Sequence, residues 1–389
     1  MSKFIKKLYK NGTEYLFSDS PYVTLGVAID TGNSNPDTCV TYTDDLSGTT
    51  DLGSIDNLQI YQNIRPCLLK DGVRVGYLKK TDFTQWAEGQ GLTGTPDITS
   101  GAAGDVMIEF PKMGWKIYKT GNIVSVKLTN NPNAGSEGFK YYAHTRDVEG
   151  DRNYLYMGAY IGTTIDGVLR SLSGKTCAAS QTIGTFRTQA QAHGESYDQQ
   201  HFYAITLIQI LYLMRFRSLQ SQTAVGRGYV DANPGNVPTG ATNAKGMIYG
   251  ETTGKLQMKC FGIEDLWGNY WTWVDGLFSD ASRNVLTAYK GFNDTGAGYK
   301  NCGASGHAAN FNAYFAKVVG TSEAGFIAAP GTGGSETTYF CDMGRVHASA
   351  LPIFGGDRNF AGYAGVFGLL VSYAASGLHA AIGSRLMFL

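Results

Sequence analysis

Short apolar segments separated by glycine-rich turns run along most of this chain. The frequent turns limit the length of its helices and strands and so restrict the folds it can adopt. The 389 residues include 51 glycines, 24 tyrosines and 19 phenylalanines but only 10 prolines. The glycines follow no collagen-like period, and together with the many aromatic rings they are typical of β-structure with numerous turns. We therefore expect strands and long loops, with aromatic side chains displayed at the surface.

The length and the charge balance exclude some classes of protein. A chain of this length is long for a single core, so two or three domains are expected. The composition, 43% apolar and 16% charged, indicates a folded protein. Because 32 basic residues balance 32 acidic ones, nothing attracts the chain as a whole to nucleic acid or to an anionic membrane. We expect no nucleic-acid partner.

The cysteines, the N-terminus and the apolar runs indicate the redox state of the protein and whether it is exported or inserted into a membrane. Six cysteines lie far apart, without a CxxC pair or a histidine at metal-like spacing, which favours a reduced protein, although an even count leaves one or two disulfides open. The basic start "MSKFIKKLYK" is not followed by the apolar segment of a signal peptide. The longest apolar run, 202–214, is shorter than the ~20 residues of a membrane span. It predicts a buried helix and no membrane insertion.

The first hundred residues are predicted to form short strands, and a Gly/Thr/Ser-rich stretch at 88–105 is the expected domain boundary. The predicted strands are 14–17, 23–29, 39–43, 58–62 and 74–78.

Beyond residue 105 the pattern predicts strands and then helices. We expect a strand at 106–110, a hairpin over 115–128 that turns at "KTGN", and a strand at 154–162. A threonine cap and a closing glycine predict a helix at 182–194, and a second helix follows within 196–222. Two helices in a strand-rich chain indicate the α+β class.

The densest motif is "GIEDLWGNYWTWVDG", residues 262–276. Its rings could form a platform for sugars, but Trp271 and Trp273 alternate as in a strand whose inner face is core, and we favour the core. Glu264, Asp265 and Asp275 lack calcium-loop spacing, and a capped turn before a strand is the simpler interpretation.

Other chemistry-bearing residues lack a recognisable site. His307 and His347 have no HExxH or HxH partner, and no GxSxG turn supplies a nucleophile. Cys302 and Cys341 have no local signature, and "GTGG" at 331–334 is not followed by the lysine of a phosphate-binding loop. We interpret all of these as structural, and expect no metal and no cofactor.

Within the same motif, Gly268, Asn269, Trp271, Trp273 and Asp275 resemble the G-N-x-W-x-W-x-D signature of the C-type lectin fold in its formylglycine-generating-enzyme-like form. The resemblance covers roughly 186–389. It implies a β-rich N-terminal domain at 1–100 for attachment and oligomerisation, followed by a C-type-lectin-like domain at 101–389.

The last segment, 351–389, resembles the variable region of phage tail-tip and diversity-generating-retroelement proteins built on that fold. There a Gly-Gly turn opens the ligand-binding segment and a Gly-x-Arg strand closes it; the glycines permit tight turns, and the arginine can bridge carbonyls beneath the loop. The implied scaffold residues are Trp267, Asn269, Trp271, Trp273, Gly355, Gly356, Gly383 and Arg385.

The family also contains enzymes and calcium-dependent sugar binders, and this chain departs from both. No cysteine follows Cys341, the histidines are scattered, and no E-P-N or Q-P-D tripeptide occurs. By elimination the resemblance implies a binding protein and not an enzyme. A divergent formylglycine-generating-like oxidoreductase and a carbohydrate-binding module remain the alternatives.

The resemblance thus implies a phage or prophage tail protein that binds a bacterial surface protein or glycan. It would sit at the virion tail tip beside other tail proteins, be made in the bacterial cytoplasm without a signal peptide, and form a homo-oligomer, with a trimer favoured by analogy. Rings and short polar groups make adaptable contacts. The implied ligand-binding residues are Asp357, Arg358, Asn359, Phe360, Tyr363, Leu369, Val371, Tyr373, Gly377 and His379. Since strand neighbours point oppositely, half of the positions Val366, Phe367, Leu369 and Val371 should be core.

Overall fold

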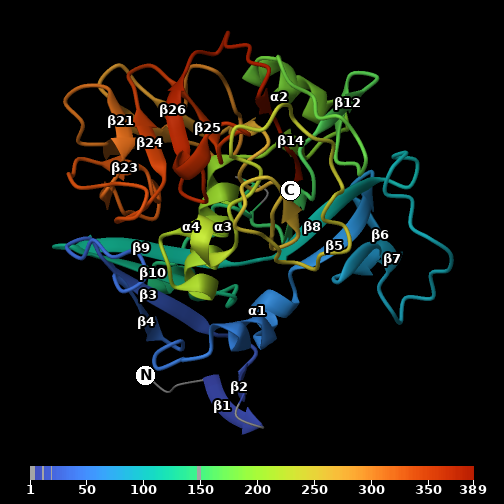
Figure 1. Ribbon diagram of the computed structural model, residues 1–389, viewed down its shortest axis with the longest axis horizontal. Coiled ribbons are helices and arrows are strands. Elements are labelled where there is room, and N and C mark those ends of the chain that lie inside the picture. Colours follow the sequence, from blue (N-terminus) through green and yellow to red (C-terminus); the bar gives the residue numbers. More distant parts are fainter. Residues whose placement is uncertain (1–4, 11–12, 19, 147–149) are drawn as a thin grey trace.

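The computed structural model describes residues 5–10, 13–18, 20–146 and 150–389. Strands predominate and helices are few (Figure 1). Of the strands expected in the first hundred residues, those at 14–17, 23–29, 39–43 and 74–78 are confirmed.

One sheet of four antiparallel strands has the order β4-β3-β10-β9. Its members are β3 (Thr24–Asp30), β4 (Val40–Asp44), β9 (Gly114–Thr120) and β10 (Ile123–Thr129). Strands β9 and β10 form the predicted hairpin, with Ile123 opposite Thr120. Val124, Val126 and Leu128 alternate along β10 and are fully buried, so one face of the sheet is core.

A second sheet of seven strands has the order β14-β28-β11-β8-β5-β6-β7. These are β5 (Arg65–Lys70), β6 (Val73–Lys79), β7 (Asp82–Trp86), β8 (Asp105–Pro111), β11 (Tyr154–Gly158), β14 (Tyr197–Gln199) and β28 (Leu386–Phe388).

Both sheets combine strands from either side of residue 100, in contrast to the expected division into 1–100 and 101–389. Strand β3 pairs with β10, and β5 pairs with β8. Residues 88–104 of the stretch 88–105 form a loop that leads from β7 at the sheet edge back to β8, which begins at Asp105. Its composition therefore marks a long connection and not a domain boundary, because strands before and after it pair with each other in the same sheets.

A third sheet of six strands has the order β21-β24-β26-β25-β17-β27 and gathers the C-terminal part of the chain. Its members are β17 (Trp271–Trp273), β21 (Phe311–Tyr314), β24 (Met343–Val346), β25 (Leu351–Phe354), β26 (Leu369–Tyr373) and β27 (Ile382–Gly383).

Smaller sheets complete the strands. A three-stranded sheet holds β18 (Leu277–Ser279), β19 (Asn284–Thr287) and β20 (Lys300–Ala304). The two-stranded pairs are β1 (Ile5–Lys10) with β2 (Thr13–Ser18), β12 (Thr163–Ile165) with β13 (Val168–Arg170), β15 (Lys259–Cys260) with β16 (Ile263–Glu264), and β22 (Lys317–Val318) with β23 (Ala328–Ala329).

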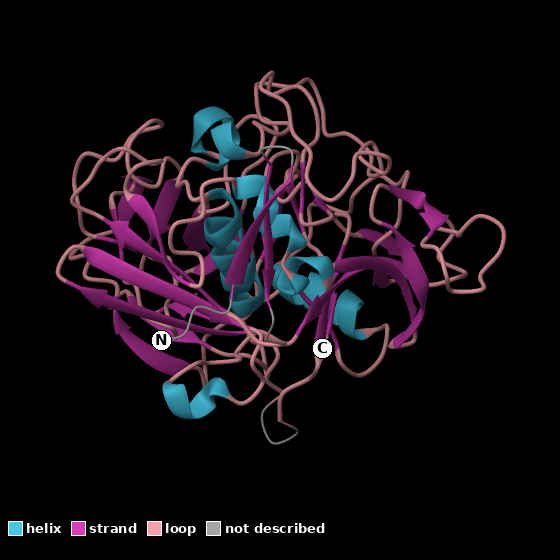
Figure 2. Cartoon of the chain, turned by 90° about the horizontal axis from the view of Figure 1, so that it is seen from below, coloured by secondary structure: helices cyan, strands magenta, loops and turns pink. Residues whose placement is uncertain are grey.

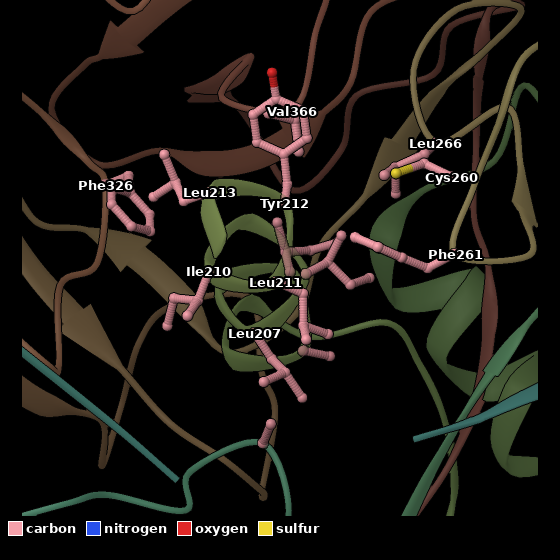
Figure 3. Packing of buried hydrophobic residues seen from close by; sticks show 14 of the residues in the cluster. Leu207, Ile210, Leu211, Tyr212, Leu213, Cys260, Phe261, Leu266, Phe326 and Val366 are labelled. Atoms are coloured by element: carbon pink, nitrogen blue, oxygen red, sulfur yellow. The ribbon is translucent and has the colours of Figure 1, made fainter. Parts of the chain in front are cut away.

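The helix α3 (Phe202–Phe216) is the centre of the core, and it confirms the buried helix predicted from the apolar run. Every residue in it except Arg215 is buried. It packs on β3 and β10, and its side chains point to all sides, toward Phe326 on one side and Phe261 on the other (Figure 3). In the view from below, strands flank the central helices (Figure 2). Across the described ranges, no helix is long and apolar enough to cross a membrane.

The remaining helices are short. The predicted helix at 182–194 is α2 (Ile183–Gln191), and the Thr182 side chain caps it by accepting a hydrogen bond from the backbone of Thr185. The segment 58–62, expected as a strand, is instead the helix α1 (Gln59–Gln62). It follows a 3-10 helix, η1 (Leu52–Asn57), after the single extended residue Leu58. Ile60 and Tyr61 of α1 are buried, so tertiary packing overrides the β-like composition. The last α-helix is α4 (Ser221–Ala224).

Candidate ligand-binding face

The motif at 262–276 lies between the two ends of the last segment, residues 351–389, which we call the tail. Strand β17 pairs antiparallel with β25 at the start of the tail and parallel with β27 near its end. Trp273 is opposite Ile353, and Thr272 is opposite Gly383. Segments that are about a hundred residues apart in sequence therefore form one sheet.

Asn269 ties this sheet to a neighbouring loop. Its Oδ1 accepts a hydrogen bond from the backbone N–H of Val237 at 3.0 Å, and its Nδ2 donates to the Val237 carbonyl at 3.0 Å and to Asp265 at 2.8 Å. The residue has a φ of 64°, a left-handed conformation that asparagine tolerates better than most residues. The asparagine of the motif thus holds a turn.

The tryptophans of the motif are core residues. Trp267, Trp271 and Trp273 are at most 4% exposed. The indole N–H groups of Trp267 and Trp273 donate to the carbonyls of Gly226 and Gln181, both at 3.2 Å. The preferred interpretation of Trp271 and Trp273 as core is confirmed, and an exposed sugar platform is excluded.

The buried tryptophans support two aromatic side chains of the tail. The ring of Phe360 meets Trp271 edge to face, with centroids 4.5 Å apart, and the ring of Tyr373 meets Trp273 in the same way at 5.8 Å. Such pairs hold rings in defined orientations and add to the effect of burial. Two half-buried tail rings therefore rest on a rigid base.

The three carboxylates of the motif are engaged inside the protein. Asp275 pairs with Arg187 at 2.6 Å, and burial nevertheless raises the pKa of Asp275 to about 6. Glu264 accepts hydrogen bonds from the backbone N–H and the hydroxyl of Thr242 at 2.8 and 2.6 Å. Within the described ranges, no group of three or more His, Cys, Asp or Glu side chains could hold a metal ion.

Arg385 bridges carbonyls where the tail passes from the six-stranded sheet to the seven-stranded one. Its guanidinium, 1% exposed, donates to the carbonyls of Gly158 and Glu264 at 2.9 Å each and to that of Asp265 at 3.1 Å. Burial lowers the pKa of Arg385 to about 10. This is the bridging that the resemblance suggested for the arginine.

Glycines are required where the tail turns. Gly355 and Gly356 have φ values of 98° and 106°. A Cβ at Gly355 would lie 2.8 Å from the Leu266 carbonyl, and one at Gly383 would lie 2.9 Å from the Ala178 carbonyl. Any side chain there would displace backbone atoms.

The structure divides the ten implied ligand-binding residues into two groups. Leu369 and Val371 are buried, 7% and 2% exposed, because β26 is an inner strand of the sheet and is covered on both faces. They belong to the core, and we leave them out of the contact surface. The other eight are exposed or half-buried and form what we call the tail face: Asp357, Arg358, Asn359, Phe360, Tyr363, Tyr373, Gly377 and His379.

Polar groups of the tail face are partly fixed by the protein. Arg358 donates to the Asn236 side chain at 2.6 Å and to the Asn233 carbonyl at 3.2 Å. Asp357 accepts a hydrogen bond from the backbone N–H of Asn359, and burial raises the pKa of its carboxyl. The charge of His379 lowers the pKa of Asp357, against the larger effect of burial.

Sequence reasoning missed residues from other strands that adjoin the tail face. Tyr363 is 41% exposed and stacks on Tyr314 of β21, with centroids 4.6 Å apart. Arg345 of β24 donates to Asn312 at 2.6 Å. Burial raises the pKa of Tyr373, and the positive charge of Arg345 partly opposes this shift. No motif marks these positions, because the sheet brings them to the tail.

The isolated cysteines and histidines have structural surroundings. All six cysteines are unpaired with one another in the structure, and five of them are buried. Burial raises the pKa of Cys341 well above its usual value. His307 stacks on Phe311 with centroids 4.3 Å apart, and its Nε2 lies 3.2 Å from the carbonyl oxygen of Ala328.

No known family model and no curated protein matches this chain. Among solved structures, this chain is similar to three variants of a Major Tropism Determinant. The P3c variant is 12% identical, with a TM-score of 0.26 over 98% of this chain and 77% of the other. The U1 variant is 10% identical, with a TM-score of 0.26 over 100% and 81%. The M1 variant is 11% identical, with a TM-score of 0.27 over 98% and 78%. A likeness at these TM-scores carries no argument about the function of this chain.

Proposed function

We propose that this chain is the receptor-binding protein of a phage or prophage tail and that it binds a bacterial surface ligand through the tail face. The observation that carries the proposal is the pairing of Phe360 with Trp271 and of Tyr373 with Trp273. Buried residues fix the rings, while Asn359, Tyr363 and His379 remain exposed around them.

The chemistry of the tail face suits recognition. Phe360, Tyr363 and Tyr373 offer apolar area with few rotatable bonds, so little entropy is lost on binding. Asp357, Asn359 and His379 supply hydrogen-bonding groups of both kinds. The surface needs no metal and no cofactor for binding, and we assign the chain no catalytic step.

The proposal extends to the assembly. The N-terminal strands would attach the chain to other tail proteins and to sister subunits at the tip of the virion, and a trimer is the favoured state. Several copies would convert weak single contacts into firm adhesion. The exposed side chains of the β1–β2 hairpin, among them Leu8 and Phe17, support a role in contacts between chains.

Adsorption to intact cells tests the proposal. The labelled full-length chain is incubated with a panel of bacterial strains, and cell-bound label is measured by flow cytometry. We expect binding to a subset of strains, and a loss of at least about tenfold for the variant Asn359→Ala/Tyr363→Ala/His379→Ala. Tyr118→Ala is the matched control, because Tyr118 is also 41% exposed but lies on β9. Equal adsorption of both variants would contradict the proposal.

Natural variation gives a second test. We expect the gene, sequenced from many isolates of one lineage, to vary at Asp357, Asn359, Tyr363, Tyr373 and His379. The codons for Gly355, Gly356, Gly383 and Arg385 should stay fixed. Substitutions spread evenly over the tail would instead leave a surface of fixed specificity.

A further inference from the structure

A polar cavity lies beside the tail face, outside the residues that the tail itself suggested. It has a volume of about 220 Å³. Its lining includes Gln222 of α4, Arg227 and Thr252. Glu336 and Asp342 of the lining come from the loop before β24. Gly362 of the tail completes the lining.

The helix α4 holds the tail against this cavity. The Gln222 side chain donates to the carbonyls of Ala361 and Ala364 at 2.7 and 2.8 Å, and the Ser221 hydroxyl accepts from the backbone N–H of Val366 at 3.1 Å. The cavity wall is therefore fixed by the same contacts that shape the tail loop, so the cavity is a built feature and not a gap between mobile loops.

Asp342 is a buried carboxyl in this lining. It is 1% exposed, and its Oδ2 accepts a hydrogen bond from the backbone N–H of Phe367 at 2.7 Å. Burial raises its pKa well above the usual value, which favours the protonated form. A neutral carboxyl both donates and accepts hydrogen bonds.

The charged groups of the lining disfavour an anionic ligand. Arg227 is paired with Asp231, its Nη2 lying 2.7 Å from Oδ1, and its Nη1 lies 3.5 Å from Glu336. Its charge is thus already balanced, and Glu336 opposes a further anion. Amides, hydroxyls and carboxyls remain, and this mixture of donors and acceptors matches ligand hydroxyl groups, which also donate and accept.

An aromatic surface adjoins the cavity. Gly362 lies so close to Glu336 that a Cβ would be 2.2 Å from the Glu336 carboxyl carbon, and the next residue is the exposed Tyr363. Tyr363 stacks on Tyr314 with ring centroids 4.6 Å apart. Burial, and after it the negative charge of Glu336, raises the pKa of Tyr314. A ring beside a polar cavity offers an apolar plane for the C–H face of a sugar, as well as hydrogen bonds for its hydroxyls.

We propose that this cavity and the Tyr314–Tyr363 pair form a subsite for one saccharide residue of the ligand. The inference rests on the proposed function and deepens it, since it makes the ligand a glycan and adds Thr252, Glu336 and Asp342 to the recognition surface.

The probe is an array of bacterial surface polysaccharides and their oligosaccharide fragments, presented to the full-length chain. The tightest-binding oligosaccharide is then titrated by calorimetry. We expect Glu336→Ala to weaken binding by at least about tenfold and Thr252→Val by about threefold, because each removes a hydrogen-bonding partner. Thr253→Val is the matched control, since Thr253 is equally an exposed neighbour but does not line the cavity.

The outcomes separate this inference from the proposed function. Failure of the wild-type chain to bind any arrayed glycan, with adsorption to cells retained, overturns the subsite and leaves a receptor-binding protein that recognises protein. Unchanged affinity in Thr252→Val and Glu336→Ala overturns it as well. Thr252 is on the surface, so its variant keeps the test informative if Glu336→Ala is unstable.

Discussion

The tail face and the β1–β2 hairpin both display aromatic and apolar side chains, but the two regions support them differently. Phe360 and Tyr373 rest on Trp271 and Trp273, and their polar neighbours belong to one tightly bonded segment. On the hairpin, Leu8, Tyr15 and Phe17 are 55%, 40% and 42% exposed.

The register of the hairpin places these three side chains on one face. Leu8 is opposite Tyr15, and Lys6 is opposite Phe17, while the other face buries Ile5 and Leu16. A two-stranded sheet with an apolar outer face is marginal on its own. The comparison teaches that the two apolar surfaces differ in support: the rings of the tail face rest on buried neighbours, whereas those of the hairpin rest on a two-stranded sheet.

Removing the support under the tail face should have the largest effect. Trp273→Ala leaves a cavity under Tyr373, and we expect the free energy of unfolding to fall by about 3–5 kcal/mol, with adsorption to cells lost. Urea unfolding followed by tryptophan fluorescence measures the change. Tyr373→Ala, the control, should reduce stability by less than half as much because Tyr373 is half-buried. Equal losses in the free energy of unfolding for the two variants would show that Trp273 stabilises the protein no more than Tyr373 does.

The junction below the tail should be nearly as sensitive. Arg385→Met removes the donors to three buried carbonyls, so we expect a loss of about 3 kcal/mol in urea unfolding. Arg358→Met, in the half-exposed tail face, should lose only about 1 kcal/mol because solvent can replace its contacts. A smaller loss of stability for Arg385→Met than for Arg358→Met would contradict the assignment of Arg385 to the scaffold and of Arg358 to the tail face.

The motif at 262–276, which supports the tail face, and the hairpin should respond to pH with opposite signs. Burial raises the pKa of Asp275 to about 6. Its contribution to the free energy of unfolding is therefore fully present below about pH 4 and is lost as the pH rises through about 6. For Glu14 of the hairpin, burial is outweighed by hydrogen bonds from Lys7, Tyr9 and Thr50, which lower the pKa to about 2. Its contribution is present above about pH 4.5 and is lost as the pH falls toward 2.

Chemical unfolding of wild type, Asp275→Asn and Glu14→Gln across pH 3–7 measures both contributions. The free energy of unfolding of wild type minus that of Asp275→Asn should fall by about 3 kcal/mol from pH 4 to pH 7. The difference between wild type and Glu14→Gln should shrink from pH 5 to pH 3. Two differences with the same slope would contradict the assignments.

The hairpin should show the smallest effect on stability and a large one on assembly. Leu8→Ser/Tyr15→Ser/Phe17→Ser changes only exposed side chains, so each should alter the free energy of unfolding by less than about 0.5 kcal/mol in the isolated chain. Sedimentation velocity should show an oligomer for wild type and a monomer for the variant. Leu378→Ser, 65% exposed beside the tail face, should leave the oligomer unchanged.

Local signals in the sequence determined much of what was predicted correctly. The alternation in β10 and the "KTGN" turn specify a hairpin, and Thr182 specifies the start of α2, because each acts over a few residues. The continuous apolar run at 202–214 required a helix buried on all sides. The alternation of Trp271 and Trp273 favoured core, and both are buried.

Only the tertiary structure decided the rest, because it depends on pairings over long separations. Strand order made 88–105 a loop and not a boundary, and burial of β26 on both faces removed Leu369 and Val371 from the surface. Tyr314, Glu336 and Asp342 reach the tail through β21, β24 and the loop between them. The sequence determined which residue types the tail offers, and the sheet determined which of them face solvent, since local patterns carry no information on what covers a strand.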